Sequence, residues 1–327
     1  MGTIAKKGDY MCTAITLGAY AGRNLDIEKS YGESVIITPK RYVLPFRKCE
    51  NLTEHYAFIG IGTVSRGYPL YYDAANEHGL YAAGLNYVGN AKYQKQCNGN
   101  TDLAPYELIP YLMSSCKSVS EARDALKDIS LIDIPFSREL STSELHFFIA
   151  DKHASITVEP DEQGLSVYDN PIGVLTNNPP FPMQMHNLAT YQGLTNEPVV
   201  NRLADSLSLK AYSRGMGALG LPGDLSSESR FVRAAFHKLN YAYSGNPCDI
   251  FHLLSTVEMP VGSLKLGEAY ERTEYTSAVD LSSLEYYVRT YDGYAISSVR
   301  LFNEDLSSTL LTQYPLSDQE SIPCINQ

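Results

Sequence analysis

The sequence has no excess of positive charge and no long apolar run. Its 26 lysines and arginines are outnumbered by 37 aspartates and glutamates, which gives a formal net charge of −11. This balance argues against binding to a nucleic-acid backbone. The longest uncharged apolar stretches, such as residues 56–64, reach about half of the roughly 20 residues that a membrane-spanning helix needs. We therefore expect a globular protein that binds no nucleic acid and inserts into no membrane.

Cysteine and histidine are scarce and scattered. The six cysteines stand at positions 12, 49, 97, 116, 248 and 324, with no CxxC pair among them. Because disulfide-stapled domains are short and dense in cysteine, this pattern predicts free thiols and a reducing compartment. The seven histidines include no HExxH motif and no cysteine–histidine cluster, so we expect no metal site.

Motifs for cofactors and for serine chemistry are also missing or incomplete. Residues 215–220 spell GxGxxG, but Pro222 and Gly223 follow at once, whereas a dinucleotide site needs a strand before the motif and a helix after it. This segment predicts a glycine-rich loop, and we expect no cofactor. Residues 114–117 spell SxxK without its companion motifs, which predicts a helix end, and no GxSxG occurs.

No linker, repeat or low-complexity tract divides the chain, so we expect a single domain over residues 12–327. Residues 1–11 are set apart because a second methionine, Met11, directly precedes Cys12. They are interpreted as a leader, a propeptide or a cloning remnant. Residues 1–22 superficially resemble a signal peptide with cleavage after Ala21, but polar residues interrupt its apolar region, and residues 13–17 better fit a first strand.

The order of predicted elements indicates an α+β fold with antiparallel sheets. With 44% hydrophobic residues, the chain can bury a large core. Strands are predicted at 13–17, 34–38, 56–63, 80–87, 146–150, 154–159, 165–169, 273–281, 284–291 and 295–301, and helices at 104–116, 118–128, 229–241 and 249–258. The second helix begins with a capping box, Ser118 to Glu121.

One group of residues suggests covalent catalysis. Cysteine is a nucleophile when a base or positive charge makes its thiolate available. Arg23 and Asp26 follow Cys12 closely in the chain. If the two flanks form a hairpin, both side chains return beside Cys12. The alternative is a buried structural cysteine with an ordinary ion pair.

A resemblance to a known family indicates a function for this group of residues. The segments MCTAIT (11–16), GRNLD (22–26), YPLYYDAANEHGL (68–80), AGLNY (83–87), GVLTNNP (173–179) and GLPGDLSSESRFVR (220–233) resemble those of bile salt hydrolases. With the penicillin V acylases, these enzymes form the choloylglycine hydrolase family of N-terminal nucleophile hydrolases. The resemblance implies a four-layer αββα sandwich of two antiparallel sheets flanked by helices, and hydrolysis of glycine- or taurine-conjugated bile salts.

The resemblance also implies a role for each residue at the site. Cys12 would be the nucleophile, and its own α-amino group, once it is the first residue, would be the base. Asp26 would orient this amine. Arg23 and Arg230 would supply positive charge, and the side chain of Asn177 with the backbone N–H of Asn86 would hold the oxyanion. Without the resemblance, both asparagines would be interpreted as turn residues.

Substrate preference depends on fewer residues. Asn86 resembles the asparagine of bile salt hydrolases, where many penicillin V acylases have tyrosine. Tyr72 and Ser65 occupy pocket-loop positions. A steroid needs an apolar cleft, although a core would use the same residue types. The candidate cleft walls are Leu25, Leu131, Ile134, Phe136 and Leu140.

Three functions remain open: a bile salt hydrolase with acyltransferase side activity, a penicillin V acylase, and a non-catalytic binding protein that keeps its leader. The first requires a chain that begins at Cys12. Signal-peptide cleavage after Ala21 would discard Cys12, so we expect the enzyme in the cytoplasm. The resemblance also implies a homo-oligomer, a tetramer.

Overall fold

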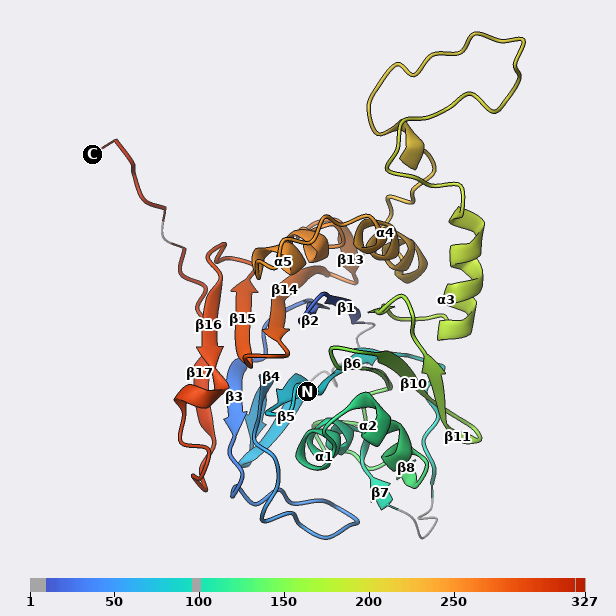
Figure 1. Ribbon diagram of the computed structural model, residues 1–327. Coiled ribbons are helices and arrows are strands. Elements are labelled where there is room, and N and C mark those ends of the chain that lie inside the picture. The colour runs from blue at the N-terminus through green and yellow to red at the C-terminus, as the bar shows by residue number, and fades with distance from the viewer. Residues whose placement is uncertain (1–9, 96–100, 321, 327) are drawn as a thin grey trace.

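Two antiparallel sheets pack face to face between two layers of helices (Figure 1). The computed structural model describes residues 10–95, 101–320 and 322–326. Helices α4 (Ser227–Leu239) and α5 (Cys248–Ser255) cover the outer face of one sheet, and α1 (Leu108–Ser115) and α2 (Val119–Leu126) lie on the other side of the sandwich. The predicted α+β sandwich is confirmed.

The first sheet carries the amino-terminal hairpin at its centre. Its strand order is β12-β1-β2-β14-β15-β16, and β13 pairs with the outer part of β14. The strands are β1 (Met11–Leu17), β2 (Tyr20–Ile27), β12 (Val174–Leu175), β13 (Leu264–Leu266), β14 (Ala269–Asp280), β15 (Glu285–Thr290) and β16 (Ser297–Arg300).

The second sheet has the strand order β11-β10-β9-β6-β5-β4-β3-β17. Its strands are β3 (Ser34–Thr38), β4 (Phe58–Ser65), β5 (Tyr68–Asn76), β6 (Tyr81–Asn86), β9 (Leu145–Ala150), β10 (Ser155–Asp161), β11 (Gly164–Asp169) and β17 (Thr312–Pro315). A short parallel pair, β7 (Thr101–Leu103) and β8 (Ile129–Leu131), lies beside helices α1 and α2.

A tight turn sets the register of the first hairpin. Gly18 has a φ of +58°, a conformation that glycine adopts without the penalty of a side chain. Strands β1 and β2 therefore pair so that Leu17 is opposite Tyr20 and Cys12 is opposite Leu25. Since Met11 is opposite Asp26, the open end of this hairpin brings the predicted nucleophile and carboxylate together.

Buried apolar side chains form two clusters. One cluster lies between the sheets and continues under α4 and α5, and it includes Ile15, Tyr81 and Phe231. A second cluster lies between the other sheet and helices α1 and α2. Packing of β1 against β6 across the sandwich brings the end of β6 close to Cys12.

Most predicted elements are confirmed, with ends that shift by a few residues. The Ser118 hydroxyl caps α2 by accepting a hydrogen bond from the Glu121 backbone, although the Glu121 side chain bonds the backbone of Lys117. Residues 114–117 do form a helix end, since α1 stops at Ser115. Sequence patterning missed α3 (Phe181–Leu188) and several strands, among them β5.

Residues 192–222 form an excursion that stands well away from the sandwich (Figure 1). The predicted glycine-rich loop at 215–220 lies here and contains only a single turn of 3₁₀ helix at Met216–Ala218. Five cysteines of the described chain are free thiols, and Cys97 lies outside the described residues. No described helix is long and apolar enough to cross a membrane.

Candidate active site

Cys12 lies near the start of β1, and its side chain is 2% exposed. The Arg23 guanidinium donates a hydrogen bond from Nη2 to Cys12 Sγ at 2.7 Å. Its other terminal nitrogen donates to the carbonyls of Tyr72 and Gly84, which belong to the opposite sheet. Arg23 is therefore anchored to both sheets and directed at the sulfur, as the hairpin pattern predicts.

Arg230 and Asn177 approach Cys12 from its backbone side. Arg230, on α4, donates to the Cys12 carbonyl at 2.6 Å and to the Thr13 hydroxyl at 2.7 Å. Asn177 Oδ1 accepts from the Cys12 backbone N–H at 2.8 Å and from Arg230 Nη2 at 2.7 Å. Asn177 Nδ2 donates to the Asn86 carbonyl at 2.8 Å. The contacts of Arg23, Arg230 and Asn177 thus connect Cys12 with Asn86. Asp26, which lies 4.0 Å from Arg230, completes the six residues to which the resemblance gives a catalytic role.

Asp26 is fully buried and only half satisfied. Its Oδ1 accepts from the Thr273 hydroxyl at 2.6 Å, and Arg230 Nη1 lies 4.0 Å from Oδ2. Within the described residues, Oδ2 has no hydrogen-bond partner. Since a buried unpartnered carboxylate oxygen is costly, this atom fits a donor that would arrive when the residue opposite it, Met11, is removed.

The residues before Cys12 pass through the site. The Met11 backbone N–H donates to Glu271 Oε1 at 2.6 Å, and the Tyr10 carbonyl lies 3.4 Å from Asn177 Nδ2. Burial raises the pKa of Glu271 to about 8. Residues 10 and 11 thus contact two groups, Glu271 and Asn177, that lie next to Cys12.

Burial and charge act in opposite directions on the pKa of the Cys12 thiol. Burial raises the pKa of the Cys12 thiol, while the positive charges of Arg23 and Arg230 and a hydrogen bond from the Asn86 backbone lower it. Burial likewise raises the pKa of Asp26 to about 6, against the charge of Arg230 and the Thr273 hydrogen bond. Exclusion of water makes both arginine charges effective at the sulfur.

We expect the positive charge of Arg23 to control the protonation of Cys12. In Arg23→Gln, loss of this charge moves the midpoint of the pH-dependent iodoacetamide labelling of Cys12 upward by about 1 to 3 pH units. Arg23→Lys, which keeps the charge, shifts it less. Thermal unfolding accompanies the assay, because the Tyr72 and Gly84 carbonyls lose a donor. An unchanged midpoint in the folded Gln variant contradicts this role.

An apolar cavity of about 280 Å³ opens at Cys12, and we refer to it as the acyl cavity. Of the predicted wall residues, Leu25, Phe136 and Leu140 line it, and so does Tyr72, which was predicted at a pocket loop. Further lining residues that sequence analysis did not propose include Ile27, Leu70, Pro105 and Tyr106. Arg47 braces this wall from outside by donating to the Tyr106 hydroxyl and the Phe136 carbonyl.

Three residues that were predicted to bind substrate, the wall residues Leu131 and Ile134 and the pocket-loop residue Ser65, do not line the acyl cavity. Leu131 belongs to β8 and packs in the cluster beside α1 and α2. Phe136 lines the cavity, but Ile134, two residues earlier in the chain, does not. Thr63 of β4 lines it, but Ser65 at the end of the same strand does not. The substrate-binding role of these three residues stays a prediction, because the lining of the acyl cavity does not include them.

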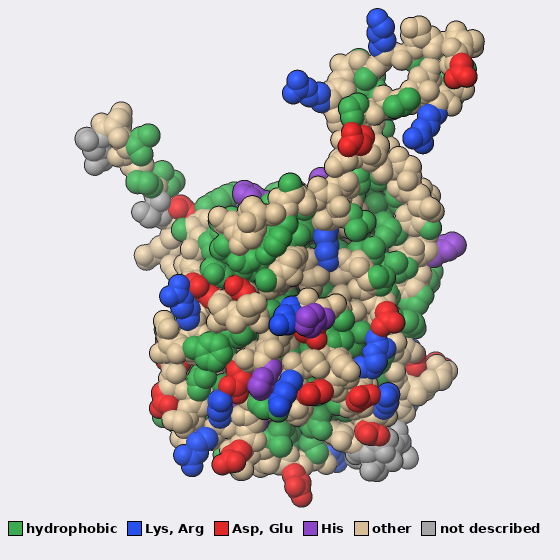
Figure 2. All heavy atoms as spheres, viewed as in Figure 1, with side chains coloured by type: hydrophobic (Ala, Val, Ile, Leu, Met, Phe, Trp, Pro, Cys, Tyr) green, Lys and Arg blue, Asp and Glu red, His purple; other side chains and the backbone are tan. Residues whose placement is uncertain are grey.

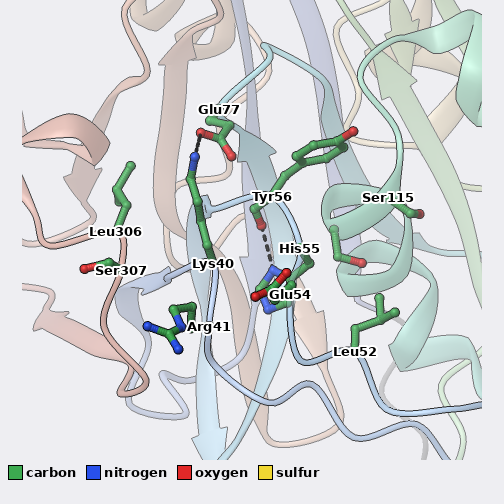
Figure 3. Close-up of a pocket in the computed structure, with 11 residues that line it drawn as sticks. Lys40, Arg41, Leu52, Glu54, His55, Tyr56, Glu77, Ser115, Leu306 and Ser307 are labelled. Carbon is green, nitrogen blue, oxygen red and sulfur yellow. Dashed lines mark hydrogen bonds and ion pairs between the residues drawn. The ribbon is translucent and has the colours of Figure 1, made fainter.

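A larger cavity, of about 850 Å³, lies elsewhere and includes none of the predicted catalytic residues. Figure 3 shows Lys40 paired with Glu77 on one wall and His55 against the backbone of Tyr56 on another. The size of a cavity therefore does not identify the reaction centre in this protein.

Within the described residues, no cluster of side chains has the composition of a metal site.

Several supporting residues come from distant parts of the chain. Thr273 holds Asp26, and the Ser227 hydroxyl accepts from the Asn177 backbone N–H at 2.8 Å. Gln184, on α3, lies 3.3 Å from the Asn177 carbonyl. Sequence spacing gave no signal for these residues, since only the folded sheets and helices bring them to Cys12.

Comparisons with known proteins agree with this geometry. The model of the family described as linear amide C–N hydrolases, choloylglycine hydrolase family, matches residues 12–314. A bile salt hydrolase/transferase of Lactiplantibacillus plantarum is 48% identical over 324 residues, which cover 97% of this chain and 100% of that protein. One from Clostridium perfringens is 36% identical over 334 residues, covering 97% and 100%.

Solved structures show the same fold. A mutant conjugated bile acid hydrolase from Clostridium perfringens superposes with a TM-score of 0.90 at 34% identity, covering 97% of this chain and 100% of that one. A penicillin V acylase from Agrobacterium tumefaciens gives a TM-score of 0.72 at 18% identity, covering 92% and 90%, and shares the fold. The chain belongs to the choloylglycine hydrolase family of linear amide C–N hydrolases, as the resemblance indicated.

Proposed function

We propose that this chain hydrolyses the amide bond of glycine- or taurine-conjugated bile salts, with Cys12 as an amino-terminal nucleophile. The observation that carries the proposal is the Arg23 guanidinium bonded to Cys12 Sγ at the mouth of the apolar acyl cavity. An apolar cavity suits a steroid acyl group, and the relatives named above as bile salt hydrolases support this substrate class.

In the proposed mechanism, the Cys12 sulfur attacks the amide carbon and a C–S bond forms. Negative charge on the carbonyl oxygen is held by the Asn86 backbone N–H and Asn177 Nδ2. The free α-amine of Cys12, oriented by Asp26, takes the thiol proton and passes it to the leaving nitrogen as the C–N bond breaks. Glycine or taurine departs, and a thioester remains on Cys12.

Water completes the cycle. The same α-amine accepts a proton from water as the water oxygen bonds to the thioester carbon. The C–S bond then breaks, the ammonium group returns its proton to the Cys12 sulfur, and the free bile acid leaves. An amine that enters in place of water receives the acyl group, which gives an acyltransferase side activity. Arg23 and Arg230 stabilise the thiolate and the negative charge throughout.

The deciding experiment compares kcat/KM for amine release from glycocholate, taurocholate and penicillin V on the same preparation. Hydrolysis of the bile salts with a clear preference over penicillin V is expected. Preference for penicillin V would replace the substrate class on the same machinery. Inactivity on all three, with the amino terminus shown to be Cys12, would indicate a protein that binds small molecules without catalysis.

We further propose that the protein assembles as a homotetramer through the excursion at residues 192–222. Figure 2 shows this segment standing clear of the body, and its Leu203 and Tyr212 side chains are 79% and 84% exposed. Exposed apolar side chains of this kind mark interfaces. Leu203→Asp and Tyr212→Asp should yield smaller species in analytical ultracentrifugation. Leu310→Asp, at an exposed residue outside the excursion, should not, and unchanged mass in all three contradicts the interface.

For location we propose the cytoplasm. The supporting argument is that Cys12 precedes Ala21, so removal of a signal peptide at that site would delete the nucleophile. Fractionation of the producing cells, with amine release assayed in each fraction, tests it, and activity confined to the secreted fraction would contradict it.

A further inference from the structure

Two cavities meet at the candidate oxyanion site. The acyl cavity contains Cys12 and Arg23, and a second cavity of about 530 Å³, the outer cavity, contains Asn177. Asn86 lines both, and so does Tyr10 while residues 1–11 are attached. A carbonyl group bound between Asn86 and Asn177 has its acyl substituent on one side and its nitrogen on the other. An acyl group in the acyl cavity therefore directs the amine half of the substrate into the outer cavity.

The outer cavity has one positively charged wall residue. Asn86, Asn177, Ser227 and Glu271 are among its described lining residues, and Lys265 is the one cationic residue in that described lining. Lys265 sits in the middle of β13, opposite Tyr270 of β14. Within the described residues it forms no ion pair, so its ammonium group is available to a ligand.

The outer cavity also has an acidic residue, Glu271. Burial raises the pKa of its carboxyl to about 8, and within the described residues it forms no ion pair with Lys265. The cavity thus combines an unpaired ammonium group with polar side chains and a position beside the scissile bond. Net charge of the whole chain is −11, so attraction of an anion has to come from such a local group.

We propose that Lys265 binds the acid group of the amine half of the substrate, the carboxylate of glycine or the sulfonate of taurine. This inference rests on the proposed function and deepens it. The same subsite would take the acid group of an amino acid that accepts the acyl group from Cys12. Lysine carries a compact charge on a flexible stem, which suits two acids whose distances from the nitrogen differ by one carbon.

Three substrates distinguish a loss of charge recognition from a general loss of catalytic activity. Glycocholate and taurocholate carry the acid group, and cholylglycinamide replaces the carboxylate with a neutral carboxamide. Lys265→Gln should lower kcat/KM about 5- to 10-fold for the two acids at low salt, chiefly through KM, and leave cholylglycinamide unchanged. Lys265→Arg should restore most of the loss. The difference between wild type and Lys265→Gln should shrink as salt is added.

Lys127→Gln is the matched control, because Lys127 is an exposed lysine at the end of α2. It should behave as wild type on all three substrates. An equal loss on acidic and neutral substrates in Lys265→Gln, or no loss on either acid, overturns the subsite while leaving the hydrolase intact. A wild-type chain starting at Cys12 that cleaves none of the three overturns the proposed function and the subsite with it.

Discussion

Cys12→Ala should abolish hydrolysis of conjugated bile salts, with a fall in kcat/KM of at least about 10⁴-fold. The substitution removes the atom that forms the bond to the acyl carbon, and no neighbouring group can replace it. Amine release from glycocholate and taurocholate measures the loss. The protein should still fold, because the Arg23 guanidinium keeps its bonds to the Tyr72 and Gly84 carbonyls.

Cys248→Ala provides the matched comparison. Cys248 is exposed at the start of α5, and its removal should leave kcat/KM and the unfolding temperature close to those of wild type. Circular dichroism and thermal unfolding of Cys12→Ala establish that the variant is folded. Retention of more than a tenth of wild-type activity by a folded Cys12→Ala protein would refute the covalent mechanism.

Local sequence predicted the first half of the site and could not predict the rest. Cys12, Arg23 and Asp26 belong to one hairpin, and a single tight turn at Gly18 fixes which residues face each other. Their proximity follows from local patterning. Asn177 and Arg230 came only from the family resemblance, because the contacts that place them join parts of the chain about 165 and 218 residues apart.

Neither local patterning nor the family resemblance predicted a role for Thr273 or Glu271. Both lie on β14, whose pairing with β2 shifts register between Thr273 and Tyr275. No periodicity in the sequence specifies that shift, and it decides which side chains face Asp26 and Met11. The cavity walls show the same limit in another form: Leu131 and Phe136 are both apolar, but only Phe136 lines the acyl cavity.

The electrostatic arrangement around Cys12 supports the proposed reactivity of this buried cysteine. A thiol buried without partners is inert, since burial favours its neutral form. Here one arginine bonds the sulfur directly and a second bonds the Cys12 carbonyl. Both guanidinium groups are held by backbone carbonyls, so they need little reorganisation when negative charge develops on the sulfur or the oxyanion.

Removal of residues 1–11 should switch the enzyme on. With the leader attached, the Cys12 nitrogen is an amide that donates to Asn177 Oδ1, and an amide nitrogen is not a base. After removal, an α-amine with an ordinary pKa near 7.7 to 8.0 becomes available. Within the described residues, Asp26 Oδ2 has no hydrogen-bond partner, and Glu271 loses the Met11 N–H. Oxygen atoms of both side chains can therefore accept from the new amino group.

The experiment places the recognition sequence of a site-specific protease directly before Cys12, in place of residues 1–11. Before cleavage, kcat/KM for glycocholate should be about 10²- to 10⁴-fold below that of the cleaved protein, which is the usual contribution of a general base. Intact mass measured on both samples shows whether Cys12 is the first residue. Cys12→Ala carrying the same cleavable leader should stay inactive after treatment. Equal activity in cut and verified uncut protein would exclude the α-amine as the base, because the uncut chain has no amine at that position.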